Sequence, residues 1–581
     1  MPRMTPSEAM VETLRMEGVT VIPGIVGSAF MDALDLFPDA GIRFLPVRHE
    51  QTAAHMADAY ARVTGTPGVC IGQNGPGVTN MVTSMAAAYL AHSPVVMISP
   101  AAGTAAVGLD GFQEIDQLKI FDAVTKAQIQ VPRPDRMAES FRTAFRIALA
   151  ERGPVQVDIP RDFFYGESEV DILEPEHYRV AARGAGDERS LDRAAEVIAG
   201  AKNPIVISGM GVVEADAIDD VRALGELLDC PVACSYLHND AFPWSHELAV
   251  GPIGYLGSKA AMRLLSEADV VIALGTRLSI FGTLPQYGMD YFPRAAKIVQ
   301  VDINPRQIGR KWPVEVGVIG DAKAATQAIT RRLEARDGRA PGEDRRARVR
   351  AAKQEWLDEL ARESSSDATP ISPRRALQEL AGVLTEDAIV TTDIGNISSA
   401  ANSYLRFTKP RKHLAALTFG NCGFAYPAAL GAKLARPGDP AIAIVGDGAW
   451  GMSLHEVMTA VEHDIPAVAL VFNNQQWGAE KRNQIDFYED RFVGTNIGHD
   501  LGGFDFAAIA RSMGAEGLRI TDPGDLGTAF ADAMRADRPT VVEVMVDPEE
   551  LAEPFRRDAL QKPKRFLSRY EHLAAPEPVR A

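Results

Sequence analysis

The sequence has few cysteines, and their spacing is uninformative. Four occur among 581 residues, at Cys70, Cys230, Cys234 and Cys422, too scattered to form a disulfide framework. Cys230 and Cys234 lack a second Cys or His pair at an interval typical of zinc sites. We therefore expect a reducing, cytoplasmic location and no structural zinc.

Long apolar segments and an excess of positive charge are also missing. No apolar run reaches the roughly 18 to 20 residues of a transmembrane helix, and the first residues, MPRMTPSEAMVETL, lack the apolar core of a signal peptide. With 60 Lys and Arg against 77 Asp and Glu, the net charge is −17, which disfavours nucleic acids and anionic membranes as partners. We expect small-molecule partners, with no nucleic acid and no membrane.

The chain is long enough for about three or four domains of ~150 residues. Short β-branched runs alternate with amphipathic helical patterns, which predicts an α/β fold of three doubly wound parallel-sheet domains. Polar, charged stretches at 174–190 and 335–373 are typical of linkers. The expected units are a first domain at 1–173, a middle domain at 190–335, a third domain at 370–560 and a C-terminal tail at 561–581.

The first and third blocks are similar to each other. Residues 68–99 and 441–474 both read as strand, glycine turn, helix and strand, and a helical segment precedes each, at 53–65 and 424–437. This order indicates a weak internal duplication.

The middle block has the pattern of a Rossmann-like sheet, with three buried-strand segments at 203–213, 268–279 and 296–305. Its G-M-G at 209–211 lacks the rest of the dinucleotide fingerprint and the ribose-binding acid. Two alternatives stay open here: a bound FAD or ADP, or a purely structural domain.

The stretch AIAIVGDGAWGMSL, residues 441–454, matches G-x-G-x-x-G but carries Asp447 where a nucleotide phosphate should approach. The next expected strand ends on Asn473 and Asn474 instead of an acid. Asp447 and Asn474 offer the hard oxygen ligands that Mg²⁺ prefers, at the carboxyl ends of neighbouring parallel strands. The pattern predicts a diphosphate held through Mg²⁺, with a plain capped turn as the alternative.

These residues resemble the thiamine-diphosphate fingerprint, and the chain resembles the acetolactate synthase and pyruvate oxidase-like family over nearly its whole length. The resemblance implies thiamine diphosphate as cofactor and Mg²⁺ bound by Asp447, Asn474 and the main-chain carbonyl of Gln476. Cys422 takes the place of a methionine that wedges under the cofactor in acetolactate synthases. The cofactor-binding residues implied are Glu50, Gly75, Asn396, Ser398, Gly420, Cys422, Gly446, Asp447, Gly448, Ala449 and Asn474.

Glu50 lies in VRHEQTAAHMADAYAR, at the expected start of a helix. The resemblance implies that Glu50 hydrogen-bonds to the aminopyrimidine ring, and His49 beside it is a second catalytic candidate. The alternative for Glu50 is an acid that only interacts with the helix dipole. In the family the pyrimidine-binding and diphosphate-binding domains of one site belong to different subunits, so the resemblance implies a homodimer or homotetramer with active sites at the subunit interface.

Within the family, several segments resemble the sulfoacetaldehyde acetyltransferase group, which converts sulfoacetaldehyde and phosphate to acetyl phosphate and sulfite in taurine- or isethionate-type sulfonate catabolism. Gln113 is a substrate-binding candidate by this resemblance, and Lys481 and Arg482 are candidates as cations near the metal loop. The alternatives are an acetolactate synthase or pyruvate oxidase acting on pyruvate, or a catalytically inactive binding member of the fold. The segments are IGQNGPGVTN, GFQEIDQL, IPRDFFYG, LTFGNCGFAYP and NNQQWGAEKRNQIDFYEDRF.

Overall fold

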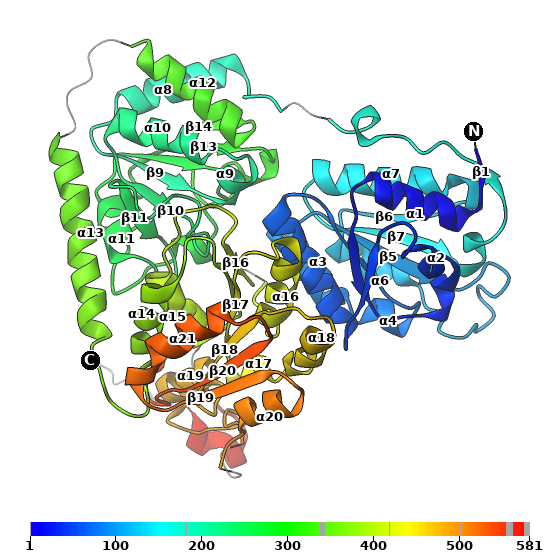
Figure 1. The fold of residues 1–581 in the computed structure, drawn as a ribbon. Helices are drawn as coiled ribbons and strands as arrows, with labels where there is room; N and C mark the ends of the chain where they lie inside the picture. The colour runs from blue at the N-terminus through cyan, green and yellow to red at the C-terminus, as the bar shows by residue number, and fades with distance from the viewer. Residues whose placement is uncertain are drawn as a thin grey trace.

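Three α/β domains follow one another along the chain, each built on a six-stranded parallel sheet packed between helices (Figure 1). This confirms the fold class predicted from the alternating strand and helix patterns. A short antiparallel pair, β1 (Arg3–Met4) with β8 (Ser168–Glu169), lies beside the first sheet. The computed structural model describes residues 2–180, 183–336, 343–416, 419–498, 502–553, 560 and 562–574.

The first and third sheets have the same strand order. When the six strands of each sheet are counted in chain order, the order across both sheets is 2-1-3-4-6-5. This shared order supports the internal duplication. The first sheet contains β2 (Val21–Gly24), β3 (Arg43–Pro46), β4 (Gly68–Ile71), β5 (Val95–Ala101), β6 (Ala127–Gln130) and β7 (Val155–Pro160). The third contains β15 (Ile389–Thr392), β16 (His413–Ala415), β17 (Ala441–Gly446), β18 (Val468–Asn473), β19 (Glu516–Ile520) and β20 (Thr540–Met545).

The middle sheet has the order β11, β10, β9, β12, β13, β14, which is the strand order of dinucleotide-binding folds. Most residues of its strands are buried, and Val and Ile are the commonest of them, as expected for a parallel sheet covered on both faces. They are β9 (Pro204–Ser208), β10 (Val232–Cys234), β11 (Ala249–Pro252), β12 (Val270–Leu274), β13 (Lys297–Asp302) and β14 (Val316–Ile319).

The helices divide among the domains in chain order. The first domain has α1 (Pro6–Met16), α2 (Met31–Leu36), α3 (Glu50–Thr64), α4 (Pro76–Thr79), α5 (Val82–Ala91), α6 (Gln117–Phe121) and α7 (Met137–Ala150). The middle domain has α8 (Glu188–Ala199), α9 (Met210–Glu214), α10 (Ile218–Leu228), α11 (Lys259–Ser266) and α12 (Ala322–Glu334). After α13 (Glu343–Glu363) come α14 (Pro373–Val383), α15 (Asn396–Tyr404), α16 (Ala425–Ala435), α17 (Asp447–Trp450), α18 (Val457–Glu462), α19 (Gly478–Tyr488), α20 (Phe506–Ser512) and α21 (Leu526–Arg535).

Helices α3 and α16 lie side by side and join the first domain to the third (Figure 1). Their facing surfaces are rich in alanine, and the alanines belong to one hydrophobic core that spans both domains. A Cβ atom at Gly431 of α16 would lie only 2.3 Å from the carbonyl oxygen of Met56 in α3. The two backbones therefore approach closely, which fixes α3 against the third domain.

The expected linker at 335–373 contains α13, a helix of 21 residues that runs from the middle domain toward the third (Figure 1). Val349, Trp356 and Leu360 are buried along one side of it, at helical spacing. The stretch is therefore not an extended linker, because this narrow apolar stripe packs the helix onto the protein. Among the described residues no helix is both long and apolar enough to cross a membrane.

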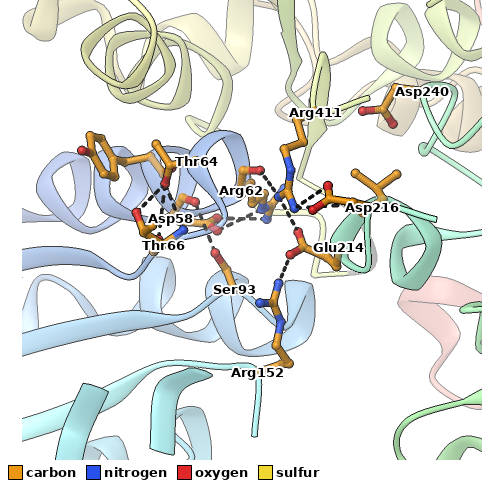
Figure 2. A network of polar contacts seen from close by, with 12 residues as sticks. Asp58, Arg62, Thr64, Thr66, Ser93, Arg152, Glu214, Asp216, Asp240 and Arg411 are labelled. Carbon is orange, nitrogen blue, oxygen red and sulfur yellow. Dashed lines mark hydrogen bonds and ion pairs between the residues drawn. The ribbon is translucent and has the colours of Figure 1, made fainter. Parts of the chain in front are cut away.

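The three domains meet at a network of charged side chains (Figure 2). Glu214, at the end of α9 in the middle domain, forms ion pairs with Arg152 of the first domain and Arg411 of the third. Arg411 also donates a hydrogen bond of 3.0 Å to the carbonyl oxygen of Arg62 in α3. All three charged groups of Arg152, Glu214 and Arg411 are largely buried, so the network is part of the interdomain packing.

Candidate active site

Asp447 and Asn474 lie at the same edge of the third sheet. Strands β17 and β18 pair in parallel, with Gly446 opposite Phe472. Asp447 directly follows β17 and begins α17, and Asn474 directly follows β18. The structure therefore brings the two predicted metal ligands to neighbouring strand ends, where open α/β sheets bind ligands.

The Asp447 carboxylate is buried but only partly satisfied. Asp447 is only 3% exposed, and its Oδ2 atom has no hydrogen-bond partner among the described residues. Burial raises the pKa of Asp447 to about 7, although the backbone N–H groups of Gly448, Gln475 and Gln476 oppose this shift. A buried carboxyl group with a free oxygen fits a site that is completed by a cation.

Two further polar side chains lie unpaired beside this edge, at the start of α15. Asn396 Nδ2 and Ser398 Oγ are buried without a hydrogen-bond partner in the described part of the chain. A Cβ atom at Gly478 would lie 2.9 Å from Asn396 Nδ2 and 3.2 Å from Asn474 Nδ2. The two asparagines therefore converge on one point, with free polar groups suited to a diphosphate.

Glycines allow close packing and a tight turn of the backbone around this point. A Cβ atom at Gly448 would lie 2.7 Å from the Trp477 ring, so a larger residue does not fit there. Gly446 precedes the turn in an extended conformation, and Ala449 is buried within α17. Gly420 has a φ of 68°, a left-handed conformation that favours glycine.

Gln476 and Lys481 are joined beside the metal loop. The Gln476 main-chain carbonyl accepts a 2.9 Å hydrogen bond from the N–H of Gly478, and its side-chain Oε1 accepts one of 2.6 Å from Lys481 Nζ. Lys481 Nζ also lies 4.8 Å from the centre of the Phe492 ring. Arg482 instead forms an ion pair of 2.9 Å with Asp486, one turn along α19. Of the two candidate cations, Lys481 is therefore the one held against the metal loop by neutral groups.

Cys422 is a half-buried thiol on a loop shaped by Asp393. Burial raises the pKa of Cys422 to about 12, with smaller contributions from the charges of Asp393 and Glu480, so the thiol is protonated at neutral pH. Asp393 follows β15, and its carboxylate accepts the N–H groups of Gly423 at 3.1 Å and Ala425 at 2.8 Å. Sequence reasoning missed Asp393, although an acid directly after a buried strand at this sheet edge is a usable signal.

Glu50 is the first residue of α3, and His49 is its N-cap. Glu50 is 7% exposed, and its Oε2 atom accepts a hydrogen bond of 2.9 Å from Asn80 Nδ2. His49 Nδ1 accepts the N–H of Gln51 at 3.1 Å, which leaves Nε2 as the ring atom free to exchange a proton. A Cβ atom at Gly77 would lie 3.0 Å from Glu50 Oε1. The glycine therefore lets the backbone lie close to Oε1 without a side chain between them.

Gln113 lies beside the same cluster. Its Oε1 atom accepts a hydrogen bond of 2.9 Å from Gln73 Nε2, and its main-chain oxygen accepts one of 3.1 Å from Asn74 Nδ2. A Cβ atom at Gly75 would lie 2.5 Å from that same main-chain oxygen. The structure thus brings Gly75 and Gln113 together, and adds Gln73 and Asn74, which sequence reasoning did not single out.

One chain presents these residues as two half-sites. Among the described residues, the Glu50 carboxylate is bonded to Asn80 of its own domain, and no hydrogen bond or ion pair joins it to Asp447, Asn474 or Gln476. Large apolar side chains are exposed near both: Phe112 (84%) adjoins Gln113, and Val493 (72%) follows Phe492. Each half-site therefore lies next to apolar surface that a single chain leaves uncovered.

The G-M-G turn of the middle domain borders a separate cavity of about 420 Å³. Its lining includes Gly211 and Gly275 and the cations Arg277 and Arg306, together with residues of the first domain such as Lys126. Neither half-site contributes to it. The hypothesis of a bound FAD or ADP in this domain stays a prediction.

Three family descriptions match the chain in order. "Thiamine pyrophosphate enzyme, N-terminal TPP binding domain" matches residues 4–120, the central domain of the same family matches 191–329, and its C-terminal TPP binding domain matches 393–544. The first match contains Glu50 and Gln113, and the last contains the strand ends that carry Asp447 and Asn474.

Curated relatives cover almost the whole chain. A sulfoacetaldehyde acetyltransferase of Castellaniella defragrans is 52% identical over 98% of this chain and 97% of its own length. A sulfoacetaldehyde acetyltransferase of Alcaligenes xylosoxydans xylosoxydans is 50% identical over the same shares, and a probable acetolactate synthase large subunit of Methanocaldococcus jannaschii is 34% identical over 94% and 93%. The chain therefore belongs to the thiamine pyrophosphate enzyme family, whose cofactor is thiamine diphosphate.

Proposed function

We propose that this protein is an acyltransferase that uses thiamine diphosphate to convert sulfoacetaldehyde and phosphate into acetyl phosphate and sulfite. The observation that carries the proposal is the identity of 52% and 50% to two sulfoacetaldehyde acetyltransferases over nearly the full chain, against 34% for an acetolactate synthase. The conversion needs no external oxidant, because the aldehyde carbon is oxidised to the acyl level while the carbon that loses sulfite is reduced to a methyl group.

The free polar groups at the third sheet edge fit the cofactor's metal and diphosphate. Asp447, Asn474 and the main-chain carbonyl of Gln476 would hold Mg²⁺, and Asn396 and Ser398 offer unpaired donors to phosphate oxygens. Thiamine diphosphate, when bound, supplies a nucleophilic carbon that attacks a carbonyl and accepts the electron pair released beside it. The buried surroundings of these residues exclude water from the diphosphate.

Glu50 and His49 are the proton-handling groups in this proposal. The Asn80 amide bonds one oxygen of the Glu50 carboxylate, so that the other oxygen is free to share a proton with the aminopyrimidine ring. His49 is oriented by the bond from the N–H of Gln51 to Nδ1, and Nε2 can carry a proton to or from substrate. Gln113 and Lys481 would contact the sulfonate or the phosphate.

The proposal includes a homodimer or homotetramer with active sites between subunits. In the described part of one chain, the Glu50 carboxylate shares no hydrogen bond or ion pair with Asp447, Asn474 or Gln476. Exposed apolar side chains, among them Leu109, Phe112 and Val493, surround the two half-sites. A second copy would cover this apolar surface and supply the missing half of each site.

The reaction itself tests the proposal. With sulfoacetaldehyde, thiamine diphosphate and Mg²⁺, sulfite release is expected to require phosphate, and acetyl phosphate should form one for one with sulfite. Pyruvate should be a poorer substrate by roughly a hundredfold or more in kcat/KM, because its carboxylate lies one carbon nearer the reacting carbonyl than the sulfonate does. Both products can be followed in one assay, sulfite with a thiol reagent and acetyl phosphate as its hydroxamate.

The same assay separates the alternatives. Acetolactate from pyruvate without sulfite from sulfoacetaldehyde would replace the proposal with acetolactate synthesis. Flavin absorbance in the purified protein, together with oxidation of pyruvate, would replace it with a pyruvate oxidase.

Lys481 offers a test of anion binding. Lys481→Met is expected to raise the KM for phosphate or sulfoacetaldehyde about 10- to 150-fold, since a charge-assisted hydrogen bond contributes roughly 1.5 to 3 kcal/mol. The matched control is Arg482→Met, which should have a smaller effect because Asp486 already neutralises that guanidinium. Steady-state kinetics with each substrate varied in turn gives both numbers, and unchanged KM values in Lys481→Met would remove Lys481 from the substrate site.

A further inference from the structure

Glu456 is a buried carboxylate of the third domain that contacts the first domain next to Glu50. It ends a short 3-10 turn, Leu454–Glu456, in the segment that follows Asp447. Its side chain is fully buried, and it faces the backbone that leads into α3.

The contacts of Glu456 are with backbone N–H groups. Its two oxygens lie 3.2 Å from the N–H nitrogen of Arg48, and Oε1 accepts a hydrogen bond of 3.0 Å from the N–H of His49. These two residues immediately precede Glu50. The carboxylate therefore holds the chain at the point where α3 begins.

Other groups of the third domain keep Glu456 charged and oriented. Thr459 Oγ1 donates a hydrogen bond of 2.5 Å to Oε2, and His455 Nε2 lies 3.4 Å from Oε1. Burial alone would raise the pKa of Glu456, but the bonds from His455, Thr459 and the N–H of Arg48 outweigh it and hold the pKa below its usual value. The carboxylate is thus an ionised acceptor for both backbone donors.

The rest of α3 is fixed independently of Glu456. His55, in the second turn, packs edge to face on Phe424 at 5.3 Å, and the helix body packs closely on α16. At the other end, the Arg62 side chain donates a hydrogen bond of 2.8 Å to the carbonyl oxygen of Ala415. The first turn, which contains Glu50, is bonded within the first domain by Asn80 and Ser84. Its backbone N–H groups are tied to the third domain by Glu456, beside the ion pair of the Arg48 side chain with Glu462.

We propose that Glu456 is a positioning residue for Glu50: by binding the N–H groups of Arg48 and His49, it sets the start of α3 and so the direction of the Glu50 carboxylate. The inference deepens the proposed function, because it rests on the role given there to Glu50. A displacement of about 1 Å at a reacting group can cost on the order of a hundredfold in rate, so a fixed helix start has a direct effect on catalysis.

The variant Glu456→Gln tests this role, because the amide has one acceptor oxygen and no charge for the two N–H donors. In the full-length protein without added cofactor, hydrogen exchange of the Arg48 and His49 amides is expected to accelerate on the order of tenfold or more, while the amides of α16 keep their rate. The matched control is Glu462→Gln, which loses an ion pair with the Arg48 side chain but leaves both backbone bonds in place. It should exchange these amides within about twofold of the wild-type rate.

The catalytic readout is the exchange of the acidic C2 proton of thiamine diphosphate in the loaded protein, which needs no substrate. Glu456→Gln is expected to slow this exchange about tenfold or more, with the affinity for thiamine diphosphate within about threefold of wild type. Because the readout is independent of sulfoacetaldehyde, a failure of the proposed reaction does not affect it. Wild-type C2 exchange in Glu456→Gln, or wild-type amide exchange at Arg48 and His49, would overturn the inference.

A milder variant covers the case in which Glu456→Gln does not fold. Thr459→Val removes the hydroxyl that orients Glu456 but keeps the side-chain shape and the carboxylate. Thr459→Val is expected to speed amide exchange at Arg48 and His49 and to slow C2 exchange of the cofactor, each by about two- to fivefold, in keeping with the loss of one hydrogen bond. Faster amide exchange spread uniformly over the first domain, in either variant, would indicate a purely structural role and would also overturn the inference.

Discussion

Asp447→Ala is expected to abolish the Mg²⁺-dependent binding of thiamine diphosphate. The substitution removes the charged ligand of the proposed metal site and leaves Asn474 and a main-chain carbonyl to hold the ion. The affinity should fall by more than the roughly 10- to 100-fold that is typical for loss of an outer-shell partner of a metal site. Titration calorimetry with the cofactor, in the presence of Mg²⁺ and of a chelator, measures the change.

Two comparisons make this result specific. Asp532→Ala, an exposed acid on α21 of the same domain, should bind the cofactor like the wild type. The chelator should lower the affinity of the wild type but have little further effect on Asp447→Ala. Unchanged cofactor affinity in Asp447→Ala would mean that the turn at 446–448 is a plain capped turn and not a metal site.

Glu50→Gln is expected to slow proton removal from the cofactor by about a hundredfold or more, as loss of a proton-transfer partner typically does. The amide can still accept the hydrogen bond from Asn80, and Glu50 lies in the first domain, away from the diphosphate residues. Folding and cofactor affinity should therefore stay close to those of the wild type. NMR of C2 hydrogen exchange measures the rate directly, and a wild-type rate would show that Glu50 has no part in the proton transfer.

Combining the two variants tests the sharing of sites between subunits. If each site takes Glu50 from one chain and Asp447 from the other, co-expression of Glu50→Gln with Asp447→Ala chains gives mixed dimers with one intact site. Random pairing in a two-fold dimer then restores about a quarter of the wild-type activity, although each variant alone has about a hundredth of it or less. No activity in the mixture would place both residues of a site in one chain.

The fold class could be predicted because each domain repeats short β-branched runs and amphipathic helices. Helix α13 was not predicted, since Val349, Trp356 and Leu360 are widely spaced apolar residues in a highly charged stretch. These residues have helical spacing, but so few apolar residues in a charged stretch are also typical of a linker sequence. The packing of α3 on α16 could not be predicted either. Alanines and Gly431 indicate that another backbone approaches closely, but they do not identify which segment it belongs to.

Some residues of the candidate site could likewise be predicted from the sequence, and others could not. Asp447 and Asn474 could be identified because each directly follows a buried strand, and strand order then brings them together. Asp393 also directly follows a buried strand and could have been identified in the same way. Glu456 could not, since its partners include backbone N–H groups that leave no trace in the sequence. Arg482 is the reverse case. The sequence indicates a cation near the metal loop, but in the structure its guanidinium is paired with Asp486, one helical turn away.

The charged network around Glu214 decides how this chain can be divided for study. Its carboxylate lies between guanidinium groups from the two other domains, and both partners are largely buried. A fragment containing only residues 190–335 would keep Glu214 but lose Arg152 and Arg411, and it would expose to water a carboxylate and an interdomain surface that the whole chain buries. Excised domains are therefore poor substitutes for the whole chain in screening, labelling or crystallisation, and expression should start from the intact polypeptide.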